Sequence, residues 1–165
     1  MLCKKLHHAA FRCKDAVATT HFYNGVLGLT FSHAINQQVV PSTGRLSPHI
    51  HLFFGMEDGS SIAFFECPDE PGEMKDMASP DWIQHFAFEV ESREVLLQAK
   101  SELEALGLQV LGPVDHDGYV LSIYFHDPSG HRLELTTPLC ARQRLRDFEV
   151  EAPRVLARWA QGSAR

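Results

Sequence analysis

The sequence predicts an α+β protein in which a βαβββ unit occurs twice. Three observations support this fold class. Each half begins with alternating apolar and polar residues, the pattern of a half-buried strand. Each half continues with a helix that has a polar cap before it and a glycine after it, and ends in a hairpin. From His8 to Gly28 is 20 residues, and from His85 to Gly107 is 22, so the halves also match in length.

The first half opens with alternation over residues 6–13, which predicts a strand. Asp15 is expected to be the N-cap of a helix over residues 16–27, because its side chain can accept a hydrogen bond from a first-turn N–H group. Residues 29–31 resume an extended pattern. Residues 33–48 show no clean periodicity and are interpreted as a loop or an irregular strand.

A hairpin closes the first half. It is expected over residues 49–68, with its turn at Glu57-Asp58-Gly59. Residues 67–82 are rich in proline, glycine and acidic side chains, and we interpret them as a linker. The first βαβββ module is therefore predicted over residues 1–66.

The second half repeats this order. Residues 83–90 alternate, which predicts a strand. Ser92 can cap a helix over residues 93–106, where apolar residues recur at helical spacing. Residues 108–111 are again extended.

The second half also ends in a hairpin, over residues 119–138, with turn chemistry at Asp127-Pro128-Ser129-Gly130. His126 and His131 flank this turn and are expected to face solvent. The second module is therefore predicted over residues 83–138.

A separate tail, residues 139–165, follows the second module. It is expected to form one or two short amphipathic helices, with Pro153 in the first turn of a helix. The apolar residues that would form its packing face are Val155, Leu156 and Trp159.

Composition limits the function classes. The chain has 165 residues, a net charge of -6 and a pI near 5.9, which disfavours binding to nucleic-acid phosphates. No apolar run approaches the length of about 20 residues that spans a bilayer. The N-terminus does not read as a signal peptide. The four cysteines are scattered, without zinc-site spacing, so we expect a reducing cytoplasm. The net charge and the absence of a long apolar run lead us to expect neither a nucleic acid nor a membrane as partner.

Several motifs occur in the same order as in a known family: LHHAAF, FYNGVLGL, QHFAFEV, ALGL and SIYFHDPSGHRLEL. Over roughly residues 5–138 the chain resembles the vicinal-oxygen-chelate superfamily, which includes glyoxalase I, extradiol dioxygenases, fosfomycin-resistance enzymes and bleomycin-binding proteins. The resemblance implies that two modules pair their sheets into an open, cupped barrel around a metal. Both a homodimer and a monomer are compatible with it.

The resemblance implies that His8, His85 and Glu134 hold one divalent metal ion. Two imidazoles and a carboxylate suit first-row metals. Iron is favoured, and manganese, nickel, cobalt and zinc are alternatives. His7 is the competitor of His8, but it has the opposite strand parity and should point away if His8 points inward.

A fourth protein ligand, as in glyoxalase I, is not expected. The resemblance places Phe64 there, or Ala63 if a one-residue gap is allowed, and neither side chain binds metal. Glu66 could fill the place only if the alignment slips. Three ligands suit extradiol dioxygenases and fosfomycin-resistance enzymes better than glyoxalase I.

The resemblance also implies catalytic residues in the second module and substrate-binding residues in the cup. His116 is expected to act as acid or base and Tyr124 to contact a substrate oxygen, as in extradiol dioxygenases. His51, Phe53 and Phe64 are expected to line the substrate-binding cup.

The leading functional hypothesis is therefore an extradiol-dioxygenase-like enzyme acting on a small substrate with two adjacent oxygens. A glyoxalase-type lyase and a fosfomycin-resistance-type transferase or hydrolase are alternatives. Ala10 stands where the fosfomycin enzymes have a threonine, and no counterpart of their cationic phosphonate-binding set is evident. A metal-free protein that binds ligands as the bleomycin-binding members do is the third hypothesis.

Overall fold

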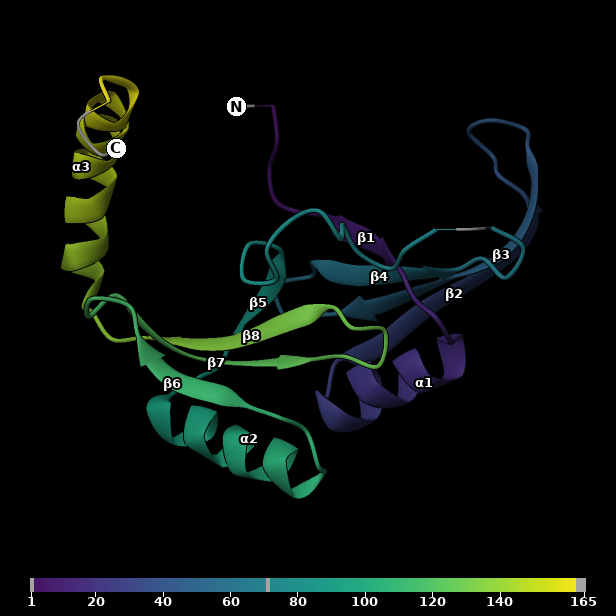
Figure 1. Ribbon diagram of the computed structural model, residues 1–165, viewed down its shortest axis with the longest axis horizontal. Coiled ribbons are helices and arrows are strands. Elements are labelled where there is room, and N and C mark those ends of the chain that lie inside the picture. The colour runs from purple at the N-terminus through teal and green to yellow at the C-terminus, as the bar shows by residue number, and fades with distance from the viewer. Residues whose placement is uncertain (1, 71, 163–165) are drawn as a thin grey trace. The chain divides into compact units, whose positions relative to one another are not determined.

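Figure 1 shows the computed structural model of the chain, which describes residues 2–70 and 72–162. The chain divides into two compact units: unit 1 comprises residues 1–85 and 126–133, and unit 2 comprises residues 86–125 and 134–165. The elements are, in order, β1 (His8–Arg12), α1 (Ala16–Thr20), η1 (His21–Val26), β2 (Thr30–Val39), β3 (Leu46–Gly55), β4 (Ser61–Glu66), β5 (His85–Glu89), α2 (Arg93–Ala105), β6 (Leu111–Asp115), β7 (Val120–His126), β8 (Arg132–Pro138) and α3 (Arg142–Ala160).

The strands form two four-stranded sheets of the same order. The first sheet runs β1-β4-β3-β2 and the second β5-β8-β7-β6. In the first sheet β1 and β4 are parallel, whereas β4, β3 and β2 pair antiparallel. The prediction of a βαβββ unit used twice is confirmed, and the fold class is α+β.

The predicted helix after β1 forms over its full length but in two geometries. Asp15 is its N-cap, with Oδ1 accepting a 2.7 Å hydrogen bond from the Ala18 N–H. The second part, η1, is π-helical, because the Leu27 N–H donates to the Phe22 carbonyl five residues earlier. Gly28, at φ +74°, ends the segment in a conformation that favours glycine.

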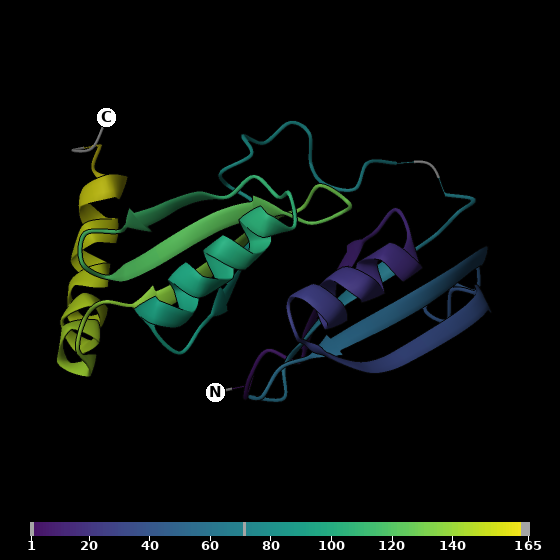
Figure 2. The same ribbon diagram turned by 90° about the horizontal axis from the view of Figure 1, so that it is seen from below.

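Helix α2 also agrees with its prediction. Ser92 caps it by accepting a 3.3 Å hydrogen bond from the Val95 N–H, and Gly107 follows its end at φ +83°. Leu96 and Leu103 are the buried residues of α2, and the helix lies along one face of the second sheet (Figure 2).

Most of residues 33–48 are strand, which agrees with the second of the two interpretations of this segment, an irregular strand, and not with a loop. β2 continues past the expected break, and β3 begins soon after a short turn. Two register shifts interrupt the pairing of β2 with β3, one between Phe31 and His33 and one between Gln37 and Val39. Each irregularity shifts the inward and outward alternation, so the strand has no continuous period of two in the sequence.

Helix α1 and η1 cover one face of the first sheet (Figure 2). The core under them contains Tyr23, Phe54 and Phe64, each with 0% exposure. The ring centroid of Tyr23 lies 5.4 Å from that of Phe54 and 4.6 Å from that of Phe64. Because side chains alternate along a strand, the residues next to Phe54 on β3 and next to Phe64 on β4 point to the opposite face of the sheet, which α1 and η1 do not cover. We call this the open face.

The β7–β8 turn belongs to unit 1 and packs against the first half of the chain. The Tyr23 hydroxyl donates a 3.0 Å hydrogen bond to Oδ2 of Asp127, and Nε2 of His131 lies 2.7 Å from the Arg12 carbonyl oxygen. His131 is only 4% exposed, so the prediction that it faces solvent is wrong. His126 is exposed at its side chain and lies 3.1 Å from Asp81.

The tail forms one 19-residue helix, α3, up to residue 160. Pro153 lies inside that helix and not in its first turn, which corrects the prediction. The expected packing face at Val155, Leu156 and Trp159 is more than half exposed. Residues 163–165 lie outside the described residues. Among the described helices, none combines the length and apolarity that crossing a bilayer requires.

Candidate functional site

The open face of the first sheet gathers three of the residues selected from the sequence. His8 is the first residue of β1, and its ring centroid lies 6.2 Å from that of His51 and 5.4 Å from that of Phe53. The rings of His51 and Phe53 are 4.2 Å apart. These residues are far apart in the sequence and meet because β1, β4 and β3 are neighbours in the sheet.

His51 is partly buried among aromatic rings. Its ring stacks on Phe65 at a centroid distance of 3.6 Å and an interplanar angle of 17°. Its Nε2 atom is buried and has no hydrogen-bond partner within the described residues. Burial, and then the neighbouring imidazoles of His8, His49 and His33, lower the pKa of His51 to about 4. The ring is therefore neutral near pH 7.

A cavity of about 440 Å³ adjoins this face. Its walls include apolar side chains from β2, β4 and the β2–β3 loop, together with polar ones from β3: Ile35, Val40, Phe65, His49 and His51. Its lining contains no lysine, arginine, aspartate or glutamate. A cavity of this size and composition suits a small, largely uncharged group.

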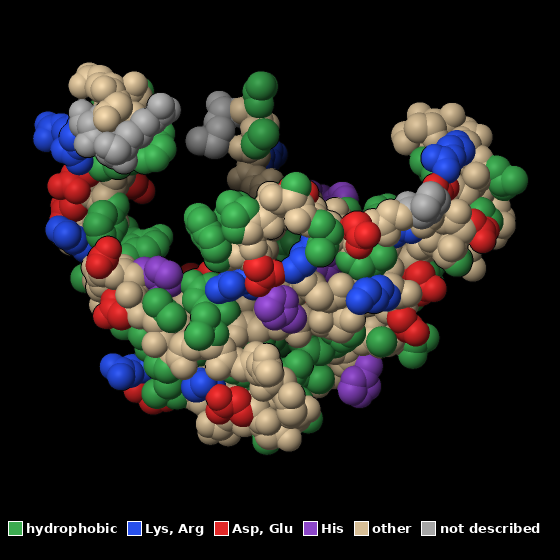
Figure 3. Space-filling model, in the orientation of Figure 1, with side chains coloured by type: hydrophobic (Ala, Val, Ile, Leu, Met, Phe, Trp, Pro, Cys, Tyr) green, Lys and Arg blue, Asp and Glu red, His purple; other side chains and the backbone are tan. Residues whose placement is uncertain are grey.

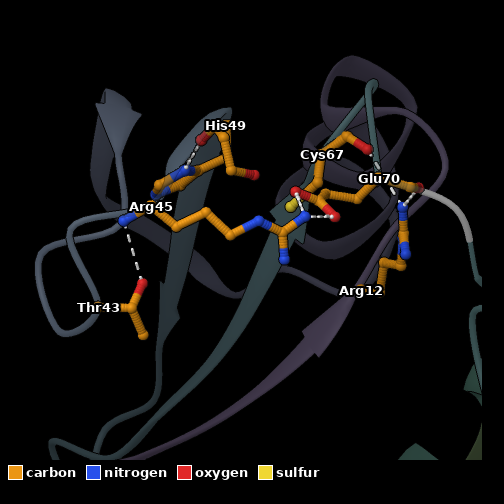
Figure 4. Close-up of polar contacts among 7 residues, drawn as sticks. Arg12, Thr43, Arg45, His49, Cys67 and Glu70 are labelled. Carbon is orange, nitrogen blue, oxygen red and sulfur yellow. Dashed lines mark hydrogen bonds and ion pairs between the residues drawn. The ribbon is translucent and has the colours of Figure 1, made fainter.

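Figure 4 shows how the chain after β4 is held beside this cavity. The guanidinium of Arg45, from the β2–β3 loop, contacts both carboxylate oxygens of Glu70 at 2.6 and 2.5 Å. Arg12 of β1 donates to the carbonyl oxygens of Cys67, at 3.1 Å, and of Glu70. Hydrogen bonds from Ser47 and then Arg45 lower the pKa of Glu70. Two cations thus fix residues 67–70 next to the hairpin.

Unit 2 presents Glu134 on β8. The carboxylate is only 7% exposed, and the Ser122 hydroxyl donates a 2.5 Å hydrogen bond to its Oε1 atom. A second contact of 3.0 Å joins the Ser122 hydroxyl to that of Thr136. Glu134 and Thr136 alternate along β8, so both lie on the face that carries Ser122. Ser122 lies in no motif that singles it out in the sequence, although its parity with Tyr124 on β7 was a usable signal.

His116 and Tyr124, the two residues expected to handle protons and substrate oxygens, lie together. Nε2 of His116 is 2.8 Å from the Tyr124 hydroxyl. Tyr124 is two residues from Ser122 on β7 and therefore shares the face of Glu134. His116 follows the end of β6 and is positioned by a turn in which its N–H donates to the Val120 carbonyl at 3.0 Å.

His85 is exposed and is the first residue of β5, the place that His8 has in β1. His8 and His85 belong to unit 1, and Glu134 belongs to unit 2. Within either unit, the described residues include no group of three or more His, Cys, Asp or Glu side chains that could hold a metal ion.

The hairpin turns align the two modules. The hydrogen bonds that close the β3–β4 and β7–β8 turns end at the carbonyls of Ser60 and His131. Three residues further along each strand stand Ala63 and Glu134, so Ala63 is the counterpart of Glu134 in the first module. The two modules therefore align with a one-residue gap. The position in the first module that corresponds to Glu134 has no metal-binding side chain.

Two other residues of β4 point away from the open face. Phe64 pairs with Leu52, whereas Ala63 pairs with Phe53, and strand alternation gives Phe64 the helix side. Its side chain is fully buried in the core, so the prediction that Phe64 lines the substrate cup is wrong. Glu66 accepts a 2.6 Å hydrogen bond from the Ala16 N–H and so stabilises the first turn of α1.

Comparisons with known proteins agree with this repeat. A family model described as "Glyoxalase/Bleomycin resistance protein/Dioxygenase superfamily" matches residues 5–135. A metallothiol transferase, FosB of Bacillus licheniformis, is 29% identical over 134 residues, which cover 81% of this chain and 82% of FosB.

Two solved structures are also similar. One is an integron cassette protein from the mobile metagenome of a Halifax Harbour sewage outfall, with 27% identity, a TM-score of 0.56, and coverage of 82% of this chain and 99% of that one. The other is a variant of the fosfomycin resistance protein FosX of Listeria monocytogenes, complexed with Mn(II) and 1S,2S-dihydroxypropylphosphonic acid. It has 25% identity, a TM-score of 0.59, and coverage of 87% of this chain and 99% of that one.

Proposed function

The chain belongs to the Glyoxalase/Bleomycin resistance protein/Dioxygenase superfamily, and we propose that it is a metal-dependent enzyme acting on a small substrate with two adjacent oxygens. One observation carries this proposal. A buried carboxylate on β8 shares a face of the sheet with a tyrosine hydroxyl on β7, and a histidine contacts that hydroxyl. Glu134 is 7% exposed, and the Tyr124 hydroxyl on the same face lies 2.8 Å from His116.

The proposed metal ligands are His8, His85 and Glu134. The donor set fits a divalent first-row ion, because two neutral imidazoles and one carboxylate leave coordination positions for a substrate. Ser122 would orient the carboxylate, as hydrogen-bonded groups around metal ligands commonly do. Iron is the metal favoured for ring cleavage, and the Mn(II) bound by the FosX relative supports manganese as the first alternative.

A bound ion would supply positive charge that lowers the pKa of a chelated substrate hydroxyl. The chain's own residues supply the rest of the chemistry. The Tyr124 hydroxyl would donate a hydrogen bond to a substrate oxygen. His116 takes up or returns the proton through its Nε2 atom, since an imidazole suits proton transfer near neutral pH. The neutral His51 and the ring of Phe53 would line the substrate-binding cup on the first sheet.

Two reactions use this arrangement. Extradiol ring cleavage of a catechol-like substrate consumes dioxygen, places both of its atoms in the product, and uses His116 and Tyr124 for proton transfer and oxygen binding. The second candidate is thiol transfer to an epoxide, which the similarity to a metallothiol transferase supports. In that reaction the sulfur–carbon bond forms as the ring carbon–oxygen bond opens and the released oxygen takes a proton. Ala10 and the uncharged cavity beside β3 weigh against a phosphonate substrate.

Elemental analysis of the purified chain is the first test. We expect about one divalent ion per chain after loading, as for a single three-ligand site. His85→Ala should lose that ion, whereas His126→Ala, which removes an exposed histidine with no role in the proposal, should retain it. Equal metal content in both variants would refute the ligand assignment. Absence of metal together with tight binding of a flat hydrophobic ligand would instead favour a metal-free binding protein.

Activity assays then separate the two reactions. Iron-loaded chain mixed with catechol should consume oxygen and produce a yellow product if ring cleavage is correct. Manganese-loaded chain mixed with a thiol and an epoxide should consume the thiol if transfer is correct. Because the cavity beside β3 is uncharged, we expect an uncharged epoxide to be a better substrate than the phosphonate fosfomycin. Ring cleavage is rejected if catechol causes no oxygen uptake by a protein shown to contain iron.

A further inference from the structure

A second cavity, of about 710 Å³, lies in unit 2 between the β6–β7 turn and α3. Residues that line it come from both elements: His116, Asp117, Tyr119, Arg144, Phe148 and Glu149. Its volume is in the range of small-molecule binding sites. Helix α3 starts at residue 142, so one wall of this cavity lies beyond the segment of residues 5–135 that matches the family model.

The base of the cavity is apolar and aromatic. The ring of Tyr119 meets that of Phe148 edge-on, with centroids 5.4 Å apart and an interplanar angle of 88°. Leu145, Phe148 and Ala152 recur at spacings of three and four residues on α3 and face the cavity together. This surface can pack against an apolar ligand body, and the aromatic contact holds α3 beside the turn.

The rim of the cavity carries charges of both signs. Arg144 is positive, with its guanidinium carbon 4.9 Å from the centre of the Phe148 ring. Asp117 and Glu149 are negative, and all three residues are exposed. Among the side chains that the structure describes, no ion pair joins any of these three to another residue. Basic, acidic and hydrophobic side chains are all visible on α3 in Figure 3.

These charges select the ligand. A ligand with only negative charge would meet Arg144 but be repelled by two carboxylates. A ligand with only positive charge would meet the carboxylates but be repelled by Arg144. A zwitterion with an apolar body satisfies both signs and also covers the aromatic base. His116, which contacts Tyr124 at 2.8 Å, would lie at the edge of such a ligand.

We propose that this cavity is a binding site for a small zwitterion with an apolar side chain, such as an apolar α-amino acid or the corresponding end of a peptide. Arg144 binds the carboxylate, Asp117 and Glu149 bind the ammonium group, and Phe148 and Tyr119 pack against the side chain. The proposal goes beyond the metal-dependent reaction and is independent of it, because it concerns binding to metal-free protein.

The test uses four probes of similar shape and different charge, titrated into the metal-free full chain at pH 7 and followed by ligand-observed NMR. They are L-phenylalanine, 3-phenylpropanoate, 2-phenylethylamine and 2-phenylethanol. We expect L-phenylalanine to bind about ten-fold more tightly than each of the others, because only it meets both charges. Equal affinities for the four probes, or no binding of L-phenylalanine, would overturn the proposal.

Charge variants locate the site on α3. Arg144→Gln should weaken L-phenylalanine about ten-fold and should tighten 2-phenylethylamine, because the repulsion between the guanidinium and the ammonium group is removed. The matched control is Arg154→Gln, an exposed arginine of α3 outside the cavity lining, and it should change neither probe. Identical behaviour of the two variants would refute the role of Arg144. Unchanged binding of uncharged 2-phenylethanol shows that the cavity is intact.

The opposite charge is tested with the double variant Asp117→Asn/Glu149→Gln. Asparagine is chosen because residue 117 has φ +53°, a conformation that asparagine tolerates. This variant should weaken L-phenylalanine and 2-phenylethylamine and should tighten 3-phenylpropanoate, because the repulsion between its carboxylate and the two acidic side chains is removed. Glu151→Gln is the control on the same helix. Weakening of 3-phenylpropanoate to the same extent would contradict the proposed ammonium site.

Discussion

The Ser122 hydroxyl donates a 2.5 Å hydrogen bond to Oε1 of Glu134, and both side chains are buried. Glu134 is a proposed metal ligand, so Ser122 would set the direction of its carboxylate. Ser122→Ala should therefore weaken metal binding about 10- to 100-fold. A chelator competition titration measures this affinity. Ser101→Ala, which removes an exposed hydroxyl of α2, should leave it unchanged, and equal affinities of the two variants would show that Ser122 has no such role.

His116 and Tyr124 share one hydrogen bond, and we expect them to act as a unit. In whichever reaction the activity assays identify, Tyr124→Phe and His116→Gln should each lower kcat, by about 100-fold or more for loss of an acid–base group. The double variant should lose much less than the product of the two single effects, because each single change already breaks the contact. Multiplicative losses would indicate that the two side chains act separately.

Tyr23→Phe should destabilise unit 1. The hydroxyl is fully buried and donates to the nearly buried Asp127, and burial together with that negative charge raises the pKa of Tyr23. Removing the donor should cost about 1–3 kcal/mol in the free energy of unfolding, measured by urea denaturation. Tyr119→Phe, at a half-exposed ring, should cost much less. A Tyr23→Phe variant as stable as the natural chain would show that the hydrogen bond contributes nothing net.

The lowered pKa of Asp81 leads us to expect that the free energy of unfolding depends on pH. Its hydrogen bond with Lys75, opposed by desolvation and assisted by His126, lowers its pKa to about 2. A lowered carboxyl pKa stabilises the folded state above the unfolded value near 4, and this contribution disappears as pH falls towards 2. Asp81→Asn should therefore reduce stability at pH 7 by no more than about 1 kcal/mol, because the group is exposed.

Urea denaturation of the natural chain and of Asp81→Asn at several pH values checks this dependence. The difference between their midpoints should be present at pH 7 and should shrink between pH 4 and pH 2. Asp69→Asn, at another exposed aspartate, serves as the control. A difference that grows as the solution becomes more acidic would have the wrong sign.

Local rules were sufficient for much of the fold. The caps at Asp15 and Ser92 follow from side-chain chemistry within one turn, and the two hairpins follow from turn residues adjacent in the chain. The sequence left most of β2 open between a loop and an irregular strand, because two register shifts destroy the alternation on which strand prediction depends. The π-helical part of the first helix has no sequence signal comparable to a cap.

The candidate site was less accessible to sequence reasoning. Resemblance to a family suggested Glu134, whereas Ser122 required knowledge of which strand lies beside β8. Phe64 was placed on the wrong face because one residue of offset reverses the side of a strand on which a side chain lies. His131 looked like an exposed turn residue, and only the packing of its turn against Arg12, 119 positions away, shows that it is buried.

That distant packing affects any attempt to divide the chain. Asp127 and His131 complete the interior of the N-terminal unit, although they are encoded after the whole of α2. A fragment that stopped in the 67–82 segment would lack these two residues and would leave the Tyr23 hydroxyl without its acceptor. Separately expressed halves should therefore be poorly soluble alone and regain structure when mixed, which makes this chain suited to fragment complementation and poorly suited to production of its modules one at a time.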